Sequence, residues 1–278
     1  MILTDVHVHT AYSADGVTPL RETVRAAHNM GLGVLGVSEH FDYDYKVLGI
    51  LAEGKEIPYT DAEAYFSEIR RLQAQEEDLA QMRLLAGGEY GFAADPRCFD
   101  LYFGLNEKYK PDFVVNSVHT CGGYDCYFSE YFKGKRKKNA YLAYLDCVRE
   151  SLDAPYRYDI VGHIGYVARN APYPDPVLRY EDFPDPIDDI LKTIILRRKI
   201  LEVNASVRTA GTPVLPGTDI LTRYFELGGR EISFSSDAHS ADALARGRET
   251  AVGILRAIGF THLTVPDGEK RFLVSLKD

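Results

Sequence analysis

Residues 5–16 read DVHVHTAYSADG, and the start of this stretch holds the pattern on which the fold prediction rests. His7 and His9 are separated by one residue at the end of a predicted strand, so their side chains point the same way, as two ligands of one metal ion require. Asp237 and His239 repeat this spacing near the other end of the chain. One such pair is weak evidence for a metal site. Two pairs are much stronger evidence, because the closure of a barrel brings its first and last strands side by side.

The remainder of the chain alternates apolar, β-branched runs with helical patterns, which is typical of a parallel sheet with crossover helices. We predict strands near Ile2–His9, Val34–His40, Arg83–Glu89, Phe113–His119, Asp159–His163, Ile200–Asn204 and Glu231–Asp237. No internal repeat stands out, and α/β barrels often reach 278 residues as one unit. We therefore expect an α/β barrel that forms a single domain over residues 1–278.

The predicted helices have recognisable ends. Thr18 followed by Pro19 predicts the start of a helix that Gly31 ends, and Thr60 with Glu63 predicts a capping box for the next helix. Further helices are expected at Asn139–Leu152, Pro186–Arg198, Thr218–Leu227 and Ser240–Ile258.

Six of the seven predicted strands run apolar and then finish on His, Glu or Asp. In parallel α/β barrels the C-terminal ends of the strands open onto one face, and the active site lies there. Six of the eight histidines belong to these ends: His7, His9, His40, His119, His163 and His239. Scattered histidines would show no such preference, so the pattern predicts metal ligation. His28 and His262 are expected to be structural or surface residues.

Composition excludes several classes of function. A formal net charge of -9 disfavours a surface that coats nucleic acid, because such binding depends on clustered Lys and Arg. The chain has no apolar run of membrane length and no secretory signal before the first strand, so we expect a cytoplasmic protein without a membrane role. Cys98, Cys121, Cys126 and Cys147 lack CxxC spacing, which argues against a zinc knuckle and, in a reducing compartment, against disulfides.

The charge of such a site favours an anionic substrate. If three divalent ions bind, Asp15, Glu89 and Asp237 offset only part of their positive charge, because the imidazoles are neutral. The excess suits a phosphate monoester, and a hydroxide shared between two metals supplies a nucleophile at neutral pH without Ser or Cys.

Six short motifs resemble the PHP (polymerase and histidinol phosphatase) superfamily. They are DVHVHTAYSADG, SEH at 38–40, GGE at 87–89, NSVH at 116–119, GHIG at 162–165 and SDAH at 236–239, in the order of that family. The resemblance implies a distorted (β/α)7 barrel with a trinuclear site of zinc, iron or manganese. It implies one ion on His7, His9, Glu89 and Asp237, a second on Glu89, His119 and His163, and a third on Asp15, His40 and His239.

Within the superfamily, the chain length and the stretch SVHTCGGYDCYFSEYFKGKRKKNAYLAYLDCV resemble the histidinol-phosphate phosphatase branch. This implies hydrolysis of L-histidinol phosphate in histidine biosynthesis, by a metal-bridging hydroxide and without a phosphoenzyme. It also implies that Arg169 and Arg208 bind the phosphate. Both follow predicted strand ends, and a guanidinium can hold phosphate oxygens in a bidentate fork, although an ordinary surface arginine is the alternative. The expected catalytic set is Glu89, Asp237, His239, Arg169 and Arg208.

Other interpretations stay open. A PHP phosphoesterase that acts on nucleotides or another small phosphate ester would keep every metal ligand. An amidohydrolase also has HxH on its first strand, but no lysine ends the fourth predicted strand here. A non-catalytic scaffold would be expected to have lost ligands. The residues that would bind the histidinol group are not derivable; Asp42, Tyr90 and Phe92 are candidates, and core packing is equally expected for the two aromatics.

Overall fold

The sheet at the centre of the protein is parallel and almost closed on itself. The computed structural model describes residues 3–51, 54–75, 82–207 and 210–277. Its seven-stranded sheet has the order β1-β2-β3-β4-β7-β8-β9, and each neighbouring pair is parallel. The strands are β1 (Leu3–Val8), β2 (Leu32–Phe41), β3 (Arg83–Gly91), β4 (Phe113–Ser117), β7 (Ile160–Val161), β8 (Ile200–Asn204) and β9 (Ile232–Ser235). All seven predicted strands are confirmed.

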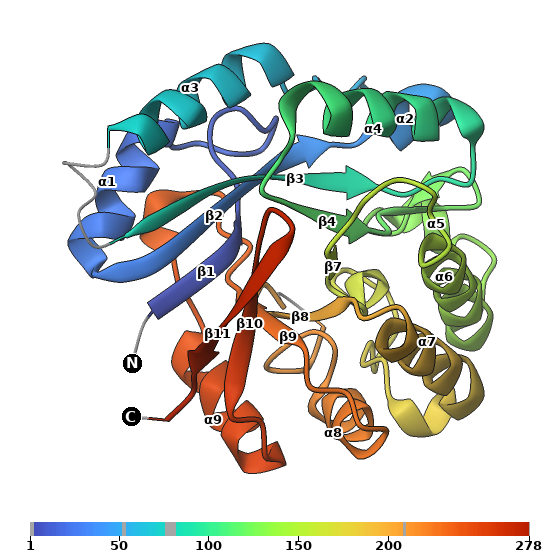
Figure 1. Ribbon diagram of the computed structural model, residues 1–278. Coiled ribbons are helices and arrows are strands. Elements are labelled where there is room, and N and C mark those ends of the chain that lie inside the picture. Colours follow the sequence, from blue (N-terminus) through green and yellow to red (C-terminus); the bar gives the residue numbers. More distant parts are fainter. Residues whose placement is uncertain (1–2, 52–53, 76–81, 208–209, 278) are drawn as a thin grey trace.

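The first and last strands meet where the two HxH-like pairs lie. His9 N donates to Ala238 O at 2.8 Å, and Asp237 N donates to His7 O at 3.0 Å. These bonds lie just beyond the end of β9 and bring residues more than two hundred positions apart side by side. The ribbon accordingly curves round from β1 through the other strands to β9 (Figure 1). The expected distorted barrel is therefore confirmed.

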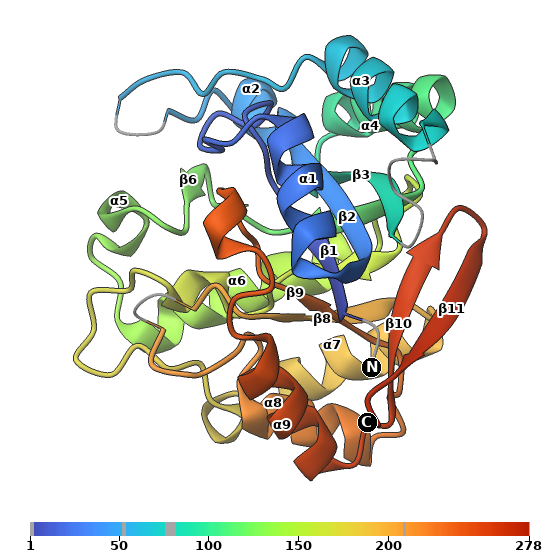
Figure 2. The same ribbon diagram turned by 90° about the vertical axis from the view of Figure 1, so that its left-hand side faces the viewer.

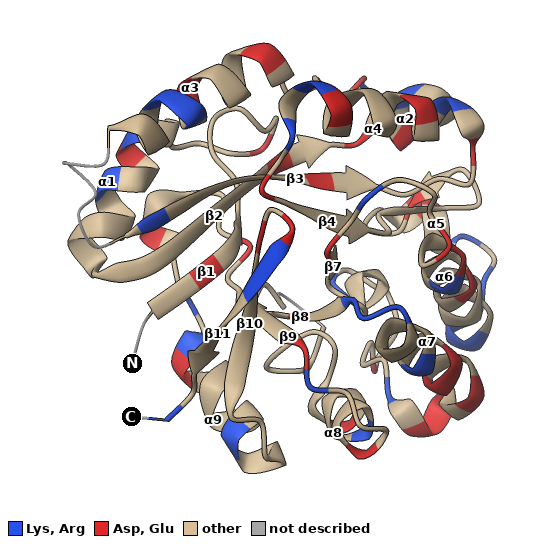
Figure 3. Cartoon of the chain, in the orientation of Figure 1, with Lys and Arg blue, Asp and Glu red and all other residues tan. Residues whose placement is uncertain are grey.

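Helices surround the sheet on its outer side (Figure 1). They are α1 (Leu20–Met30), α2 (Tyr43–Leu48), α3 (Ala62–Ala74), α4 (Pro96–Tyr109), α5 (Ser129–Phe132), α6 (Lys137–Ser151), α7 (Pro184–Leu196), α8 (Thr218–Glu226) and α9 (Arg248–Ile258). Short 3₁₀ turns occur at η2 (Tyr166–Ala168), η3 (Tyr180–Asp182) and η4 (Ala241–Ala243). Most strands carry few charged residues, whereas α3, α4, α6 and α7 carry both signs (Figure 3), as expected for elements that face the interior and the solvent respectively.

The helix predictions omitted three helices and were wrong in two details. The helices α2, α4 and α5 were not predicted; Asp95 caps α4 through a bond from Arg97 N, and Pro96 begins it. The predicted capping box at Thr60 does not form, because Asp61 accepts from Ala64 N instead and the Thr60 hydroxyl donates to Tyr12 O. The predicted helix Ser240–Ile258 is divided into η4 and α9 by a turn over residues 244–247, which ends at Gly247 with a φ of 76°.

Two antiparallel additions complete the fold. The short strands β5 (Thr120–Cys121) and β6 (Tyr124–Asp125) form a hairpin after β4, and β10 (His262–Asp267) pairs with β11 (Lys270–Ser275) at the end of the chain. Figure 2 shows these two hairpins on opposite sides of the sheet. The bond from Gly268 N to Asp112 O places the β10–β11 turn near the start of β4, away from the strand ends that carry the histidines. Neither hairpin was predicted.

No helix among the described residues has the length and apolar character required to cross a membrane.

Candidate metal centre and active site

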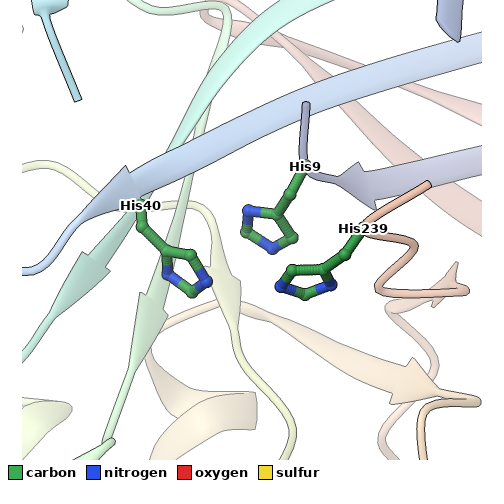
Figure 4. A group of neighbouring side chains, drawn as sticks. All are labelled: His9, His40 and His239. Carbon is green, nitrogen blue, oxygen red and sulfur yellow. The ribbon is translucent and has the colours of Figure 1, made fainter. Parts of the chain in front are cut away.

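The six histidines predicted as ligands lie together at the C-terminal ends of the barrel strands. The ring of His9 stacks on His40 at 4.2 Å and on His239 at 4.3 Å between ring centroids (Figure 4). The His119 and His163 rings are 5.2 Å apart, and His7 lies 5.0 Å from His9. We call these six residues the histidine cluster. The other two histidines, His28 and His262, are exposed, as expected.

Glu89 lies at the centre of the histidine cluster, and each of its carboxylate oxygens faces different imidazoles. Oε2 lies 3.2 Å from His7 Nε2 and 3.0 Å from His40 Nδ1. Oε1 lies 2.8 Å from His163 Nε2 and 3.2 Å from His119 Nε2. A carboxylate in this position can bridge two cations.

Asp237 lies just beyond the end of β9, points toward the cluster and has an unusual backbone conformation. Its Oδ1 lies 3.3 Å from His9 Nε2, and its Oδ2 accepts a bond of 2.6 Å from Arg169 Nη2. The φ angle of Asp237 is 53°, in the left-handed region that costs free energy for a residue with a side chain. Strain of this kind is common at functional sites, where the surrounding structure holds it.

Asp15 lies at the outer edge of the centre. Its side chain is 62% exposed, with Oδ2 3.1 Å from His239 Nε2 and Oδ1 3.7 Å from His40 Nε2. All nine residues predicted as metal ligands are thus brought together. Their role as ligands stays a prediction.

The donor atoms of the centre fit divalent cations. The atoms His7 Nε2, His9 Nε2, His40 Nδ1 and Glu89 Oε2 are buried and have no hydrogen-bond partner. Buried polar atoms without a partner are rare in folded proteins, and a coordinated cation would satisfy these. The ligand atoms of His7, His9 and Glu89 lie within 4.8 Å of one another, as do those of Glu89, His119 and His163 and those of His9, His40 and His239. Mixed nitrogen and oxygen donors suit zinc, iron and manganese.

Charge within the centre is balanced between imidazoles and carboxylates. Burial opposes the charged form of Glu89, but His7, His119 and His40 hold its pKa well below the usual value. Burial and the neighbouring imidazoles of His40 and His239 lower the pKa of His9 to about 3. Near neutral pH, His9 is therefore neutral and Glu89 is ionised, which are the forms that bind a metal.

Glu202 is a residue that the sequence prediction missed. It lies fully buried in β8, and its Oε1 is 2.6 Å from His7 Nδ1, which leaves His7 Nε2 directed toward Glu89. Its other oxygen accepts from His163 N. A carboxylate behind a ligand imidazole fixes the tautomer and the ring orientation. The available signal was a glutamate inside the apolar run ILEVN, because a charged residue is rarely buried without a partner.

Two further acidic residues contact the cluster. Asp42 Oδ1 is hydrogen-bonded to His119 Nδ1 at 3.0 Å. Glu39 accepts a bond from Ser13 Oγ, which in turn lies 3.3 Å from His9 Nδ1. Asp42 therefore helps to orient the His119 ring, and Glu39 helps to orient the His9 ring through Ser13.

A cavity of about 480 Å³ opens above the centre. Its floor includes Asp15, His40, Glu89, His119, His163, Arg169, Asp237 and His239, and its walls include Asp42, Tyr45, Tyr59, Asp125, Tyr127, Phe128 and Tyr166. Of the three docking candidates from the sequence, Asp42 lines this cavity. Tyr90 and Phe92 are buried in the core, and Tyr90 donates to Asn106 Oδ1 at 3.0 Å.

The two predicted arginines have different outcomes. Arg169 follows η2, is 6% exposed and lines the cavity, and it donates to Asn204 Oδ1 at 3.1 Å as well as to Asp237. It therefore positions the carboxylate of Asp237 while it faces the cavity. Arg208 lies outside the described residues.

Comparison with known proteins shows similarity along almost the whole chain. A model of the PHP domain matches residues 5–206. A probable histidinol-phosphatase of Clostridium acetobutylicum is 29% identical, over 89% of this chain and 91% of that protein. The histidinol-phosphatase of Lactococcus lactis is 28% identical, over 96% of this chain and 95% of that protein.

Solved structures are similar over the same extent. The crystal structure of the Lactococcus lactis histidinol phosphate phosphatase, complexed with zinc, L-histidinol and phosphate, aligns with a TM-score of 0.82 at 26% identity and covers 97% of this chain and 98% of that chain. A putative histidinol phosphatase from Listeria monocytogenes shares the fold, with a TM-score of 0.75 at 20% identity, over 89% of this chain and 99% of that chain. With its matching motifs, its nearly closed parallel barrel and its histidine cluster, this chain belongs to the PHP domain family.

Proposed function

We propose that this protein is a metal-dependent phosphomonoesterase that converts L-histidinol phosphate and water into L-histidinol and phosphate. The observation that carries the proposal is the set of buried, unpartnered imidazole and carboxylate atoms, which belong to His7, His9, His40 and Glu89; of these residues, His40 and Glu89 line an open cavity. The relatives named histidinol-phosphatases, and the similar structure that holds zinc, L-histidinol and phosphate, support the choice of substrate. We further propose that residues 1–278 form one domain and act in the cytoplasm, in histidine biosynthesis.

Three divalent ions of zinc, iron or manganese are proposed for the centre. His7, His9, Glu89 and Asp237 would hold one ion, Glu89, His119 and His163 a second, and Asp15, His40 and His239 a third. Divalent ions, when bound, polarise phosphoryl oxygens and make water an effective nucleophile at neutral pH.

The protein side chains position the reacting groups. Arg169 fixes Asp237 through its 2.6 Å bond and presents a buried positive charge to the cavity, where phosphate oxygens would lie. A guanidinium matches a phosphate in geometry and charge, so Arg169, together with Arg208, is proposed to bind the phosphate. Glu89, Asp237 and His239 line the floor beside it and complete the proposed catalytic set.

The cavity wall suits the rest of this substrate, which carries an amine and an imidazole. Asp125 is 6% exposed and accepts hydrogen bonds from Tyr45 at 2.8 Å and Tyr166 at 3.3 Å. Tyr127 and Phe128, which follow β6, form part of the same cavity wall. Aromatic faces and carboxylates both attract cationic groups, so we propose that the histidinol end lies against this wall.

The decisive experiment measures phosphate release by the zinc-, manganese- or iron-loaded protein. We expect L-histidinol phosphate to be hydrolysed with a higher kcat/KM than a panel of nucleotides and sugar phosphates. A preference for any member of the panel would overturn the proposed substrate. The absence of phosphate release with every metal would overturn the proposed phosphatase activity.

A second experiment tests the phosphate-binding role proposed for Arg208. The variant Arg208→Ala should raise KM or lower kcat sharply at unchanged metal content. Arg246→Ala, at a side chain that is 67% exposed, should match the wild type.

A further inference from the structure

Three of the four cysteines gather where the β5–β6 hairpin meets α6. Cys121 ends β5, Cys126 follows β6, and Cys147 lies on α6. Cys147 Sγ lies 2.8 Å from Cys121 Sγ, and both thiols are free. Cys121 Sγ also lies 3.3 Å from the carbonyl oxygen of Ala143, one turn earlier on α6. Two independent contacts thus place the Cys121 sulfur on the face of α6 that carries Cys147.

We propose that Cys121 and Cys147 form a site of reversible oxidative modification, at which a peroxide converts the dithiol to an intramolecular disulfide. A disulfide bond is about 2.0 Å long, so the two sulfur atoms need to approach by less than about 1 Å. In a reducing compartment the dithiol is the resting form. The modification therefore depends on an added oxidant, of which hydrogen peroxide is the simplest.

The chemistry balances in two steps. One sulfur of the pair, in its thiolate form, attacks one peroxide oxygen, which breaks the O–O bond and forms a sulfenic acid, and the hydroxide that leaves takes up a proton to become water. The other sulfur then attacks the sulfenic sulfur, so the S–S bond forms, the S–O bond breaks and a second water leaves. The two thiols lose two electrons in total, and the peroxide is reduced to two waters.

The bond would connect the cavity wall to α6. Cys126 N donates to His119 O at 2.8 Å, and Asp125 beside it lines the cavity. The hairpin that contains Cys121 thus supports both a residue of the histidine cluster and the proposed histidinol wall. Oxidation would join this hairpin to α6 at a point about one turn from the C-terminal end of that helix.

Cys126 is the competing partner for Cys121. Cys126 is fully buried, lies just after β6 and also contacts the Cys121 sulfur, whereas Cys147 is partly exposed, with its own sulfur 2.8 Å from that of Cys121. Accessibility to peroxide therefore favours Cys147 over Cys126. Cys98, which is fully buried on α4, provides an internal control.

The test treats the zinc-loaded, full-length protein with limiting hydrogen peroxide, blocks the remaining thiols by alkylation and maps the tryptic peptides. We expect the loss of two of the four thiols, a cross-link between the peptide with Cys147 and the peptide with Cys121, and complete reversal by dithiothreitol. Trypsin separates these peptides because Arg136, Lys137 and Lys138 lie between them. The variant Cys126→Ser should keep the cross-link, as should Cys98→Ser.

The variant Cys147→Ser should lose the cross-link. It changes a partly exposed side chain, so we expect it to fold like the wild type. The proposal is overturned if peroxide leaves all four thiols of the wild type intact while it oxidises a small thiol. It is equally overturned if two thiols disappear without a link between the two peptides, because that outcome excludes a bond between Cys121 and Cys147.

Discussion

Two imidazoles of the histidine cluster are held through Nδ1 by acidic side chains. His7 uses Nδ1 toward Glu202, and His119 uses Nδ1 toward Asp42. In both residues Nε2 is the atom that faces Glu89. The acids behind the rings therefore decide which nitrogen is available for a metal, and they do so before any metal binds.

Replacing Glu202 by Gln tests this arrangement. The amide keeps the shape but removes the charge that fixes the His7 tautomer, so we expect zinc affinity to fall about 10- to 100-fold. Competition with a chelator of known affinity measures this change directly. Glu249→Gln, at an exposed glutamate of α9, is the matched control and should bind zinc like the wild type. Equal zinc affinity of the Glu202→Gln variant would remove Glu202 from the centre.

Asp5 is expected to make the free energy of unfolding depend on pH. Its carboxylate is fully buried and accepts bonds from Ser236 N at 2.9 Å and Ala245 N at 2.8 Å, which anchors the loop that carries His239. Burial raises the pKa of Asp5 to about 6. A raised pKa means that the folded state binds the proton more tightly than the unfolded state, so the stability from this group is present at low pH and is lost as the pH rises through about 6.

Comparison of the wild type with Asp5→Asn isolates this contribution. The asparagine does not titrate, so the wild type should lose about 2 kcal/mol relative to the variant between about pH 4.5 and about pH 7.5. Urea unfolding of both proteins in the presence of a chelator gives the two free energies at each pH. If the difference in unfolding free energy between the two proteins does not change with pH, Asp5 does not have the raised pKa.

Among the elements, β3 shows why a glycine stands two residues before Glu89. A Cβ atom on Gly87 would lie only 2.4 Å from the Phe113 ring, and Tyr65 donates to Gly87 O at 3.0 Å. The Phe113 ring thus fills the space inside the barrel that the missing side chain leaves. The GGE motif therefore contains a packing requirement beside a proposed metal ligand.

The variant Gly87→Ala should destabilise the protein by about 1–3 kcal/mol, because the Phe113 ring has to move within a closely packed interior. Gly104→Ala is the matched control: Gly104 is exposed on α4, and a Cβ there has no neighbour within 4 Å. Alanine in a helix should stabilise by up to about 1 kcal/mol. Urea unfolding measures both effects, and equal unfolding free energies of the two variants would refute the packing argument.

At the scale of the whole molecule, the centre joins strands from the beginning, middle and end of the chain. The histidine cluster draws on the ends of β1, β2, β4, β7 and β9, and Glu89 contributes from β3. A cation bound there would connect all these strands at once. Metal binding should therefore contribute to the stability of the entire barrel.

Removal of the metal by a chelator should lower Tm by roughly 10 °C, which corresponds to the stabilisation by a ligand at about a thousandfold excess over its Kd. Differential scanning calorimetry measures this shift. Added zinc should restore Tm, whereas magnesium should not, because magnesium prefers oxygen ligands. An unchanged Tm after verified removal of the metal would show that the centre does not hold the strands together.

The sequence by itself determined the seven strands of the barrel, the type of fold and the nine residues proposed as metal ligands. Alternation of apolar and helical patterns is a local property, and the spacing of His7 and His9 fixes that they point the same way. The errors occurred where the local signals were ambiguous, as at Thr60 and Asp61, or where a short element depends on its surroundings, as in the two hairpins.

Only the tertiary structure decided which residues meet across the barrel. Glu202 lies 195 positions from His7, and the wall of the cavity and the sulfur contact between Cys121 and Cys147 also join separate elements. Periodicity states which side of an element is buried, but it contains no information on what that side contacts. The register of the strands and the closure of the sheet supply that information, since they set the distance between side chains that the chain itself keeps far apart.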